Sequence, residues 1–314
     1  MLDRFNRKID YLRFSLTQRC NLNCGYCGNR NCLSVKDELG PFEIQQLVQA
    51  FVHCGITKLR LTGGEPLLRR DLTEIVGNTA AIKDLRDISV TTNGILLTHA
   101  LAGELKAAGL RRVNISLDSL KPLRYKEITG GGSLSDALNG IDAALVASLT
   151  PLHINVVLIK GINDDEAEDF ILYARKNPVT VRFIELMPFA PGDNGGGIVP
   201  NSEILARHPY LTPVEGFSRA QPSVDYTAPN WQGKVGFISP MTEKFCHACN
   251  RVRVLADGSL MPCLGSEEKT DLKPFLNDET KLIETIKTAI RGKPTGHHFE
   301  RGCAVGYSLQ NIGG

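Results

Sequence analysis

Short apolar runs and longer amphipathic stretches alternate along most of the chain. The apolar runs are rich in β-branched residues and have the length of buried strands, at 11–16, 58–62, 88–92, 113–117, 154–158 and 181–186. The stretches between them carry apolar residues at helical spacing and predict helices at 41–54, 71–82, 99–108, 134–147 and 164–176. This alternation predicts an α/β fold with a parallel sheet and right-handed crossovers, either as a barrel-like closure or as an open doubly wound sheet.

The composition changes beyond Met187. The segment 189–202 is too rich in glycine and proline to continue a packed element, so we expect a loop there. From about Phe217 the chain has turn residues, a hairpin-like stretch at 233–239 and a final helix around 278–291. We therefore expect two domains, a larger one at 1–215 and a smaller C-terminal region at 216–314.

The overall composition is that of an ordinary globular protein. Of 314 residues, 42% are hydrophobic and 22% are charged, and the formal net charge is +2. This balance argues against a nucleic-acid-binding protein driven by bulk electrostatics, although clustered arginines could still hold a multiply charged small molecule. The first residues lack the apolar stretch of a signal peptide, and no run of eighteen apolar residues follows. We expect a cytoplasmic protein with no nucleic-acid or membrane partner.

Six of the nine cysteines fall into two tight groups, which points to metal or cluster ligation rather than to disulfides. In the first group, Cys20, Cys24 and Cys27 follow the first strand as C-x3-C-x2-C. Three thiolates can hold three irons of a four-iron cubane and leave the fourth iron open as a reaction site. The alternative is a structural zinc, which needs four closed ligands, and Cys32 completes no familiar zinc pattern.

The second group has the spacing C-x2-C-x13-C and consists of Cys246, Cys249 and Cys263. The alternative here is a zinc knuckle completed by His247, but this residue lies between two ligands and would reach the same metal only under strain. Unclustered cysteines are more often small buried hydrophobes than ligands. The chain has three such residues, Cys32, Cys54 and Cys303.

A glycine-rich loop follows the second predicted strand. Gly63 and Gly64 permit close backbone approach, and Glu65 offers a carboxylate to an ammonium group. Together with the first cysteine group and Tyr26 within it, this loop resembles the radical S-adenosylmethionine superfamily. In that superfamily the open iron binds S-adenosylmethionine, and an electron from the cluster breaks a carbon–sulfur bond to give a 5′-deoxyadenosyl radical.

Segments spread over nearly the whole chain resemble the GTP 3′,8-cyclases of molybdenum cofactor biosynthesis. They are the two cysteine groups, LRLTGGEPLLRRDL, TTNG, KGIND, FIELM, NRVRV and the Ile-Gly-Gly end. The resemblance implies an incomplete (β/α)6 TIM-like barrel with a smaller C-terminal region closing the open side, two [4Fe-4S] clusters and S-adenosyl-L-methionine. It also implies the conversion of GTP to (8S)-3′,8-cyclo-7,8-dihydroguanosine 5′-triphosphate, by hydrogen abstraction from C3′ and attack on C8. This is the first step of molybdenum cofactor (molybdopterin) biosynthesis.

The family's residue roles carry over to the positions that match its motifs. For S-adenosylmethionine these positions are Tyr26, Gly64, Ser116 and Met187. For GTP they are Arg13, Arg60, Thr91, Lys160, Arg251 and Arg253. In the family, the open iron of the second cluster binds the purine. No residue is assigned as a conventional acid or base, because the chemistry begins with an electron.

The arginines differ in their sequence surroundings. Arg13 and Arg60 lie inside apolar strands, which argues against solvated surface charges. The alternation of Arg251 and Arg253 places both on one face of an extended segment. Guanidinium groups suit a triphosphate because they form charge-assisted, often bidentate bonds to phosphate oxygens. We expect four other arginines near helix or loop ends to be solvated, namely Arg69, Arg70, Arg111 and Arg112.

The resemblance also implies partners and a role for the chain's end. The partners are GTP, an electron donor for the cluster and the cyclic pyranopterin monophosphate synthase that receives the product. In the family, the tail that corresponds to Gly313 and Gly314 enters the pocket and arranges the substrate-binding arginines. The oligomeric state stays open, with a homodimer as one candidate. The loop 28–32 and the segment 192–199 match the family poorly, and no roles are carried to them.

Two other functions stay open from the sequence. A radical S-adenosylmethionine enzyme that modifies peptides also carries auxiliary clusters after its barrel, but it usually has more cysteines than the three in the second group. A non-catalytic metal-binding module for nucleic acid is disfavoured by the near-neutral charge and the single tryptophan.

Overall fold

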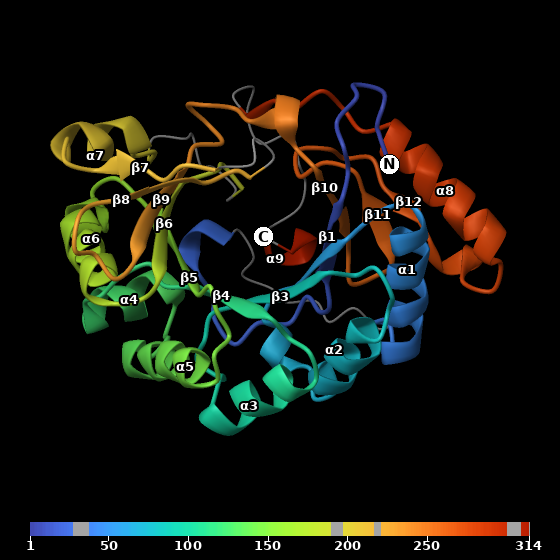
Figure 1. Ribbon diagram of the computed structural model, residues 1–314, viewed down its shortest axis with the longest axis horizontal. Helices are drawn as coiled ribbons and strands as arrows, with labels where there is room; N and C mark the ends of the chain where they lie inside the picture. Colours follow the sequence, from blue (N-terminus) through green and yellow to red (C-terminus); the bar gives the residue numbers. More distant parts are fainter. Residues whose placement is uncertain (28–37, 190–196, 217–220, 300–308, 314) are drawn as a thin grey trace.

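The computed structural model describes residues 1–27, 38–189, 197–216, 221–299 and 309–313. Its centre is a curved sheet whose strands follow the order β12-β11-β10-β1-β2-β3-β4-β5-β6-β9-β8-β7 (Figure 1). The strands expected from the apolar runs are confirmed, and neighbours among them pair in parallel. They are β1 (Tyr11–Ser15), β2 (Lys58–Thr62), β3 (Asp87–Thr92), β4 (Arg112–Ser116), β5 (His153–Leu158) and β6 (Thr180–Glu185).

Strands from the C-terminal part of the chain extend this sheet at both ends. Next to β6, in parallel, lies β9 (Lys234–Ile238), followed by antiparallel β8 (Val224–Thr227) and β7 (Thr212–Pro213). The stretch 233–239, expected to be hairpin-like, is therefore the single strand β9, which pairs with β6 on one side and with β8 on the other. Next to β1, in parallel, lies β10 (Arg251–Val254), followed by antiparallel β11 (Ser259–Met261) and β12 (Thr270–Asp271). In the described residues β7 and β12 do not pair with each other, so the barrel is incomplete.

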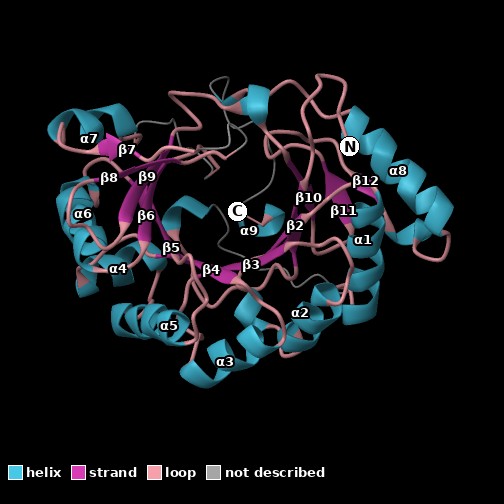
Figure 2. Cartoon of the chain, in the orientation of Figure 1, coloured by secondary structure: helices cyan, strands magenta, loops and turns pink. Residues whose placement is uncertain are grey.

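Helices cover the outer side of the curved sheet (Figure 2). Six lie where amphipathic stretches predict them: α1 (Pro41–His53), α2 (Leu72–Ala80), α3 (His99–Ala107), α5 (Leu134–Val146), α6 (Ala167–Lys176) and α8 (Glu279–Arg291). Three were not predicted: α4 (Pro122–Thr129), α7 (Asn201–Arg207) and α9 (Leu309–Ile312). The 3-10 turns are Gly25–Cys27, Pro66–Leu68, Asp164–Glu166, Cys246–Ala248 and Lys273–Phe275. None of the helices in the described ranges has the length and apolar character needed to cross a bilayer.

The two faces of the sheet have opposite character. Outward side chains such as Phe14 and Leu59 are fully buried in the apolar core that the sheet shares with the helices. The intervening positions, Arg13 and Arg60, point to the inside of the curve, because successive strand residues face opposite sides. The concave side is thus lined by polar and charged residues, whereas a closed barrel of this type is normally filled by packed branched side chains.

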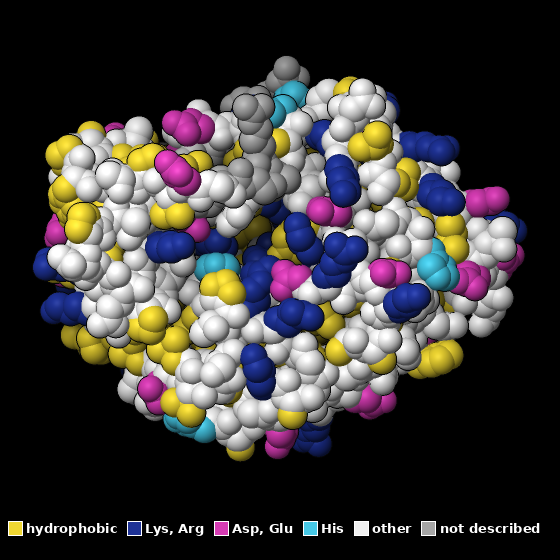
Figure 3. Space-filling view, viewed as in Figure 1, with side chains coloured by type: hydrophobic (Ala, Val, Ile, Leu, Met, Phe, Trp, Pro, Cys, Tyr) yellow, Lys and Arg dark blue, Asp and Glu magenta, His cyan; other side chains and the backbone are white. Residues whose placement is uncertain are grey.

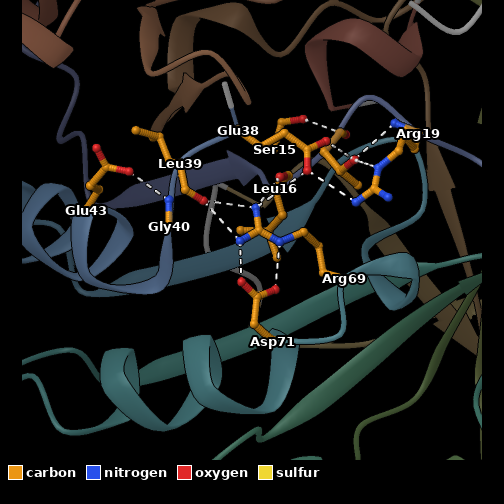
Figure 4. Close-up of polar contacts among 10 residues, drawn as sticks. Ser15, Leu16, Arg19, Glu38, Leu39, Gly40, Glu43, Arg69 and Asp71 are labelled. Carbon is orange, nitrogen blue, oxygen red and sulfur yellow. Dashed lines mark hydrogen bonds and ion pairs between the residues drawn. The ribbon is translucent and has the colours of Figure 1, made fainter. Parts of the chain in front are cut away.

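Arg69 is a structural residue, and its expected solvation is wrong. Its side chain is only 6% exposed and donates to the carbonyl oxygens of Leu16 and Leu39, each at 3.0 Å (Figure 4). It also forms a two-point ion pair with Asp71, at 2.6 and 2.8 Å. Arg69 therefore joins the end of β1, the segment before α1 and the start of α2.

Replacing Arg69 by methionine is expected to lower the free energy of unfolding by about 3 kcal/mol, because two buried carbonyls and Asp71 lose a charged donor. Urea unfolding of the full chain, followed by circular dichroism, measures this loss. The neighbouring exposed Arg70 supplies the matched control, since Arg70→Met removes an equal side chain from the surface. Equal stability of the two variants would contradict the structural role of Arg69.

Candidate active site

The concave side of the sheet encloses a cavity of about 720 Å³. It extends from the first residues of the parallel strands, such as Lys58 and Arg112, to the loops that follow the strands, such as Gly64. Lys and Arg side chains gather around a hollow near the middle of the face in Figure 3. The short helix α9, far from these strands in sequence, lies inside the curve of the sheet (Figure 1). One large ligand site is therefore built from almost every strand.

The first cysteine group lies in the loop after β1 and borders the cavity through Cys20, Cys24 and Cys27. The three thiols are close enough to affect one another. Burial raises the pKa of Cys24 well above its usual value, and Asp118, Cys27 and Cys20 raise it further. A metal cation bound here would lower the pKa of Cys24 and stabilise its thiolate. Thiolates are the form of cysteine that binds metals.

The second cysteine group borders the same cavity from the C-terminal region. Cys246 and Cys249 flank a 3-10 turn, and Cys263 follows β11. Burial raises the pKa of Cys246. Burial acts in the same direction on Cys249, but Lys293 and Arg251 outweigh it, and the pKa of Cys249 is lowered. Basic side chains therefore favour the thiolate form of Cys249.

Each cysteine group offers three thiols, which is the protein ligand set of a four-iron cluster with one open iron. Throughout the described ranges, no three His, Cys, Asp or Glu side chains are placed to hold one metal ion. Thiolates around one zinc lie about 3.8 Å apart, as follows from Zn–S bonds of about 2.3 Å in a tetrahedron. A four-iron cubane takes its thiolates at wider spacing, and three thiolates leave one iron for another ligand. The two sets of three thiols at the edge of the cavity thus fit two [4Fe-4S] clusters, each with one open iron.

The positions assigned to S-adenosylmethionine all border the cavity: Tyr26, Gly64, Ser116 and Met187. The structure also gives a packing reason for Gly64. A Cβ there would lie 2.3 Å from the backbone oxygen of Arg19, so any side chain would separate this loop from the cysteine loop.

Two buried carboxyls accompany these residues. Glu65 accepts hydrogen bonds from the backbone N–H of Asn93 and from the Thr92 hydroxyl, both at 2.7 Å. Burial raises the pKa of Glu65 to about 7. Asp118 accepts from the Tyr26 hydroxyl at 2.7 Å, and burial raises its pKa to about 6. Sequence reasoning missed Asp118, although it closes the NISLD segment at the end of β4. Both carboxyls border the cavity.

Five of the six positions assigned to GTP border the cavity, namely Arg13, Arg60, Thr91, Arg251 and Arg253. The sixth, Lys160, is an exposed residue after β5 and does not line it. Burial and the neighbouring Arg251 charge together lower the pKa of Arg253 to about 10. The pKa of Arg13 is also lowered, first by burial and then by Arg253 and Arg60. Crowded buried cations of this kind favour a bound anion.

The tail reaches these arginines. The backbone oxygen of Gly313 accepts from Arg13 and from Arg253, each at 3.1 Å. Gly314 lies outside the described residues, as do Cys32 and Cys303. Cys54, the third unclustered cysteine, is buried, as expected.

Sequence reasoning missed further basic residues of this cavity: Lys58, Arg112, Arg182, Lys234 and Lys293. Arg112 was expected to be solvated, which is wrong, because it begins β4 at an inward position and bonds both oxygens of Asp87, at 2.5 and 3.1 Å. Arg182 is buried in β6, 3.8 Å from Asp225. Register is the signal that would have found Arg112 and Arg182, since each lies at an inward position of its strand.

His153 is a neutral residue among these cations. Asn114 donates through Nδ2 to the Val90 carbonyl, which leaves its Oδ1 to accept from Nδ1 of His153 at 2.9 Å. The proton is thereby fixed on Nδ1. Burial lowers the pKa of His153 well below its ordinary 6.5, and Arg182, Arg112 and Arg60 lower it further.

This environment predicts a pH dependence of stability. Because the folded-state pKa of His153 is depressed, its contribution is complete above pH 6.5 and is lost as the pH falls below that value, by up to about 1.4 kcal/mol per pH unit. Urea unfolding between pH 7.5 and pH 5 should show a steeper loss for the wild type than for His153→Gln. Exposed His99 supplies the control, and a wild-type slope that only His99→Gln reduces would contradict the assignment.

Comparisons with known proteins agree with this site. The model of the Radical SAM superfamily matches residues 14–174, and that of Molybdenum Cofactor Synthesis C matches residues 179–299. The chain is 44% identical to the GTP 3′,8-cyclase of Moorella thermoacetica over 324 residues, covering 100% of both chains. It is 43% identical to that of Clostridium botulinum strain Langeland over 304 residues, covering 95% of each.

Solved structures share the fold. The structure of Streptococcus suis SuiB superposes with a TM-score of 0.59 at 13% identity, covering 95% of this chain and 75% of that one. The same protein bound to S-adenosylmethionine superposes with a TM-score of 0.57 at 14% identity, covering 86% and 65%. The identity over essentially the full length of the curated relatives decides the family. The chain belongs to the GTP 3′,8-cyclases, within the radical S-adenosylmethionine superfamily.

Proposed function

We propose that this cavity is the site at which the enzyme converts GTP to (8S)-3′,8-cyclo-7,8-dihydroguanosine 5′-triphosphate, in the first step of molybdenum cofactor biosynthesis. The observation that carries the proposal is the meeting of two three-cysteine groups and a crowd of buried arginines in one cavity. The cysteines supply ligands for two [4Fe-4S] clusters, Cys20, Cys24 and Cys27 for the first and Cys246, Cys249 and Cys263 for the second. The first cluster, when held there, would supply the electron for cleavage of S-adenosyl-L-methionine, the source of the radical that would take hydrogen from C3′ of GTP.

The chain's residues bind and orient the two small molecules. Tyr26, Gly64, Ser116 and Met187 contact S-adenosylmethionine beside the first cysteine group. Asp118 holds the Tyr26 hydroxyl in place at 2.7 Å. These contacts fix the cofactor against the cavity wall and so hold its reacting carbon near the substrate.

The opposite part of the cavity binds GTP. We assign the triphosphate to Arg13, Arg60, Arg251 and Arg253, since guanidinium groups of buried arginines form short, charge-assisted bonds to phosphate oxygens. Thr91 adds a hydroxyl from β3. Lys160 keeps its assignment from the family motif, although it would have to approach from outside the cavity lining.

Four further assignments belong to this proposal. An electron donor reduces the first cluster, and the product passes to the cyclic pyranopterin monophosphate synthase. The chain is divided at about 215 into a partial barrel and a C-terminal region that carries the second cluster and part of the substrate site. A homodimer is the proposed assembly.

The test is an anaerobic assay of the reconstituted, reduced protein with S-adenosylmethionine and GTP, in which 5′-deoxyadenosine and nucleotide products are measured together. Formation of both deoxyadenosine and cyclised GTP is expected. Deoxyadenosine without any change in GTP would refute the assigned substrate and favour a peptide substrate. Two equivalents of zinc and no iron in the protein would refute the radical chemistry itself.

A further inference from the structure

Lys293 is a buried ammonium group beside the second cysteine group. It lies shortly after α8, its relative exposure is 2%, and its Nζ donates to the backbone oxygen of Pro262 at 2.5 Å. Pro262 directly precedes the ligand Cys263. An ammonium group removed from water is costly unless an opposite charge accompanies it.

No carboxylate supplies that opposite charge in the part of the chain that the structure describes. The ion pairs found there involve other cations. Arg7, which also reaches this region, shows the contrast: it donates to the Cys246 carbonyl at 2.9 Å, and its charge is offset by Asp3 at 2.6 Å. Among the described residues, the contact of the Lys293 ammonium is with a carbonyl dipole, so an anionic group in the cavity would stabilise its charge.

The cysteines of the second group can supply this negative charge as thiolates. Lys293 borders the cavity together with Cys246, Cys249 and Cys263. The Lys293 charge stabilises the thiolate forms of Cys246 and Cys249, although burial keeps the pKa of Cys246 above its usual value. Three thiolates exceed the positive charge of an oxidised cubane core, so the occupied site carries net negative charge.

We propose that Lys293 is the charge partner of the second cluster and sets its reduction potential. This inference rests on the proposed function, because it takes the second group to hold a four-iron cluster. Net charge and nearby hydrogen bonds are principal determinants of a cluster's potential. One-electron reduction adds negative charge to the cluster, and a fixed cation beside it favours that reduced form. Lys293 is thus a positioning residue that acts through the cluster and not on GTP.

Substitutions can separate the charge from the hydrogen bond. Lys293→Gln keeps a donor for the Pro262 carbonyl and removes the charge, while Lys293→Arg keeps the charge. Lys287, exposed on α8, supplies the matched control as Lys287→Gln. The potential is measured in the full-length holoenzyme by a redox titration followed by electron paramagnetic resonance, and the second cluster's signal is the one missing from Cys246→Ser.

The expected result is a more negative potential for Lys293→Gln, a near wild-type potential for Lys293→Arg and no change for Lys287→Gln. If Lys293→Gln fails to retain the second cluster, retention of iron by Lys293→Arg supports the charge role equally. An unchanged potential in Lys293→Gln would overturn the proposal, as would equal loss of iron from both variants. Weaker GTP binding at unchanged potential would instead make Lys293 a substrate contact, which also overturns it.

The titration needs no turnover, so it is independent of the assigned reaction. If the wild type forms no cyclised GTP and the potential still shifts in Lys293→Gln, the proposed function fails and the charge partnership stands. If the wild type holds no iron at the second cysteine group, the inference and its premise fail together.

Discussion

Arg253→Ala is expected to weaken GTP binding by about 10- to 100-fold, because the triphosphate loses a charge-assisted donor in a buried site. The loss includes a contribution from the tail, since Arg253 also holds the Gly313 carbonyl at 3.1 Å. Cleavage of S-adenosylmethionine by the reduced enzyme should stay largely intact, because the assigned cofactor contacts are elsewhere. Equilibrium dialysis with GTP and chromatographic assay of 5′-deoxyadenosine measure the two effects separately.

Arg111 provides the matched control for this prediction. It is an exposed arginine next to Arg112, so Arg111→Ala changes the total charge equally without touching the cavity lining. Arg111→Ala should leave GTP affinity unchanged. An equal loss of GTP binding and cofactor cleavage in Arg253→Ala would show that the residue supports the site as a whole and does not select for phosphate.

The two cysteine groups are expected to fail in different ways. Cys24→Ser should abolish formation of 5′-deoxyadenosine altogether, because the ligand set of the first cluster is broken. Cys246→Ser should keep the first cluster but lose cyclised GTP, because the second cluster is then absent from the substrate side. Each variant should contain about half the iron of the wild type, as measured by plasma emission spectrometry.

Cys54 tests whether these losses are specific to the groups. It is a buried cysteine whose sulfur lies 3.9 Å from the Ile283 carbonyl oxygen, away from both cysteine groups. Cys54→Ala should retain all the iron and both products. Full production of cyclised GTP by Cys246→Ser would contradict the role assigned to the second group.

Periodicity predicted the parallel part of the fold because each of its strands is buried on the side that faces the helices. Phe14 and Leu59 belong to runs whose apolar character comes from that packing. The helix α4 was missed for the opposite reason. It has eight residues, half of them polar, and its limits are set by Pro122 at its start and by Gly130, which ends it at a φ of 68°.

The candidate site was predictable where the residues stand close together in the sequence. Cysteine spacing found both groups, and apolar neighbours marked Arg13 and Arg60 as unusual. Arg112 and His153 could not be found in this way, because each begins its strand and only the pairing of β3, β4 and β5 turns it into the cavity. The burial of Arg69 could not be predicted because the carbonyls that it binds, those of Leu16 and Leu39, are far from it in the sequence.

The central claim is that this cavity brings the adenosyl radical to the ribose of GTP. The most direct measurement uses GTP with deuterium at C3′ in the anaerobic assay, followed by mass spectrometry of the 5′-deoxyadenosine. The account predicts that the deoxyadenosine gains the deuterium and that the cyclised product has lost it. Unlabelled deoxyadenosine formed alongside intact, labelled GTP would contradict the account.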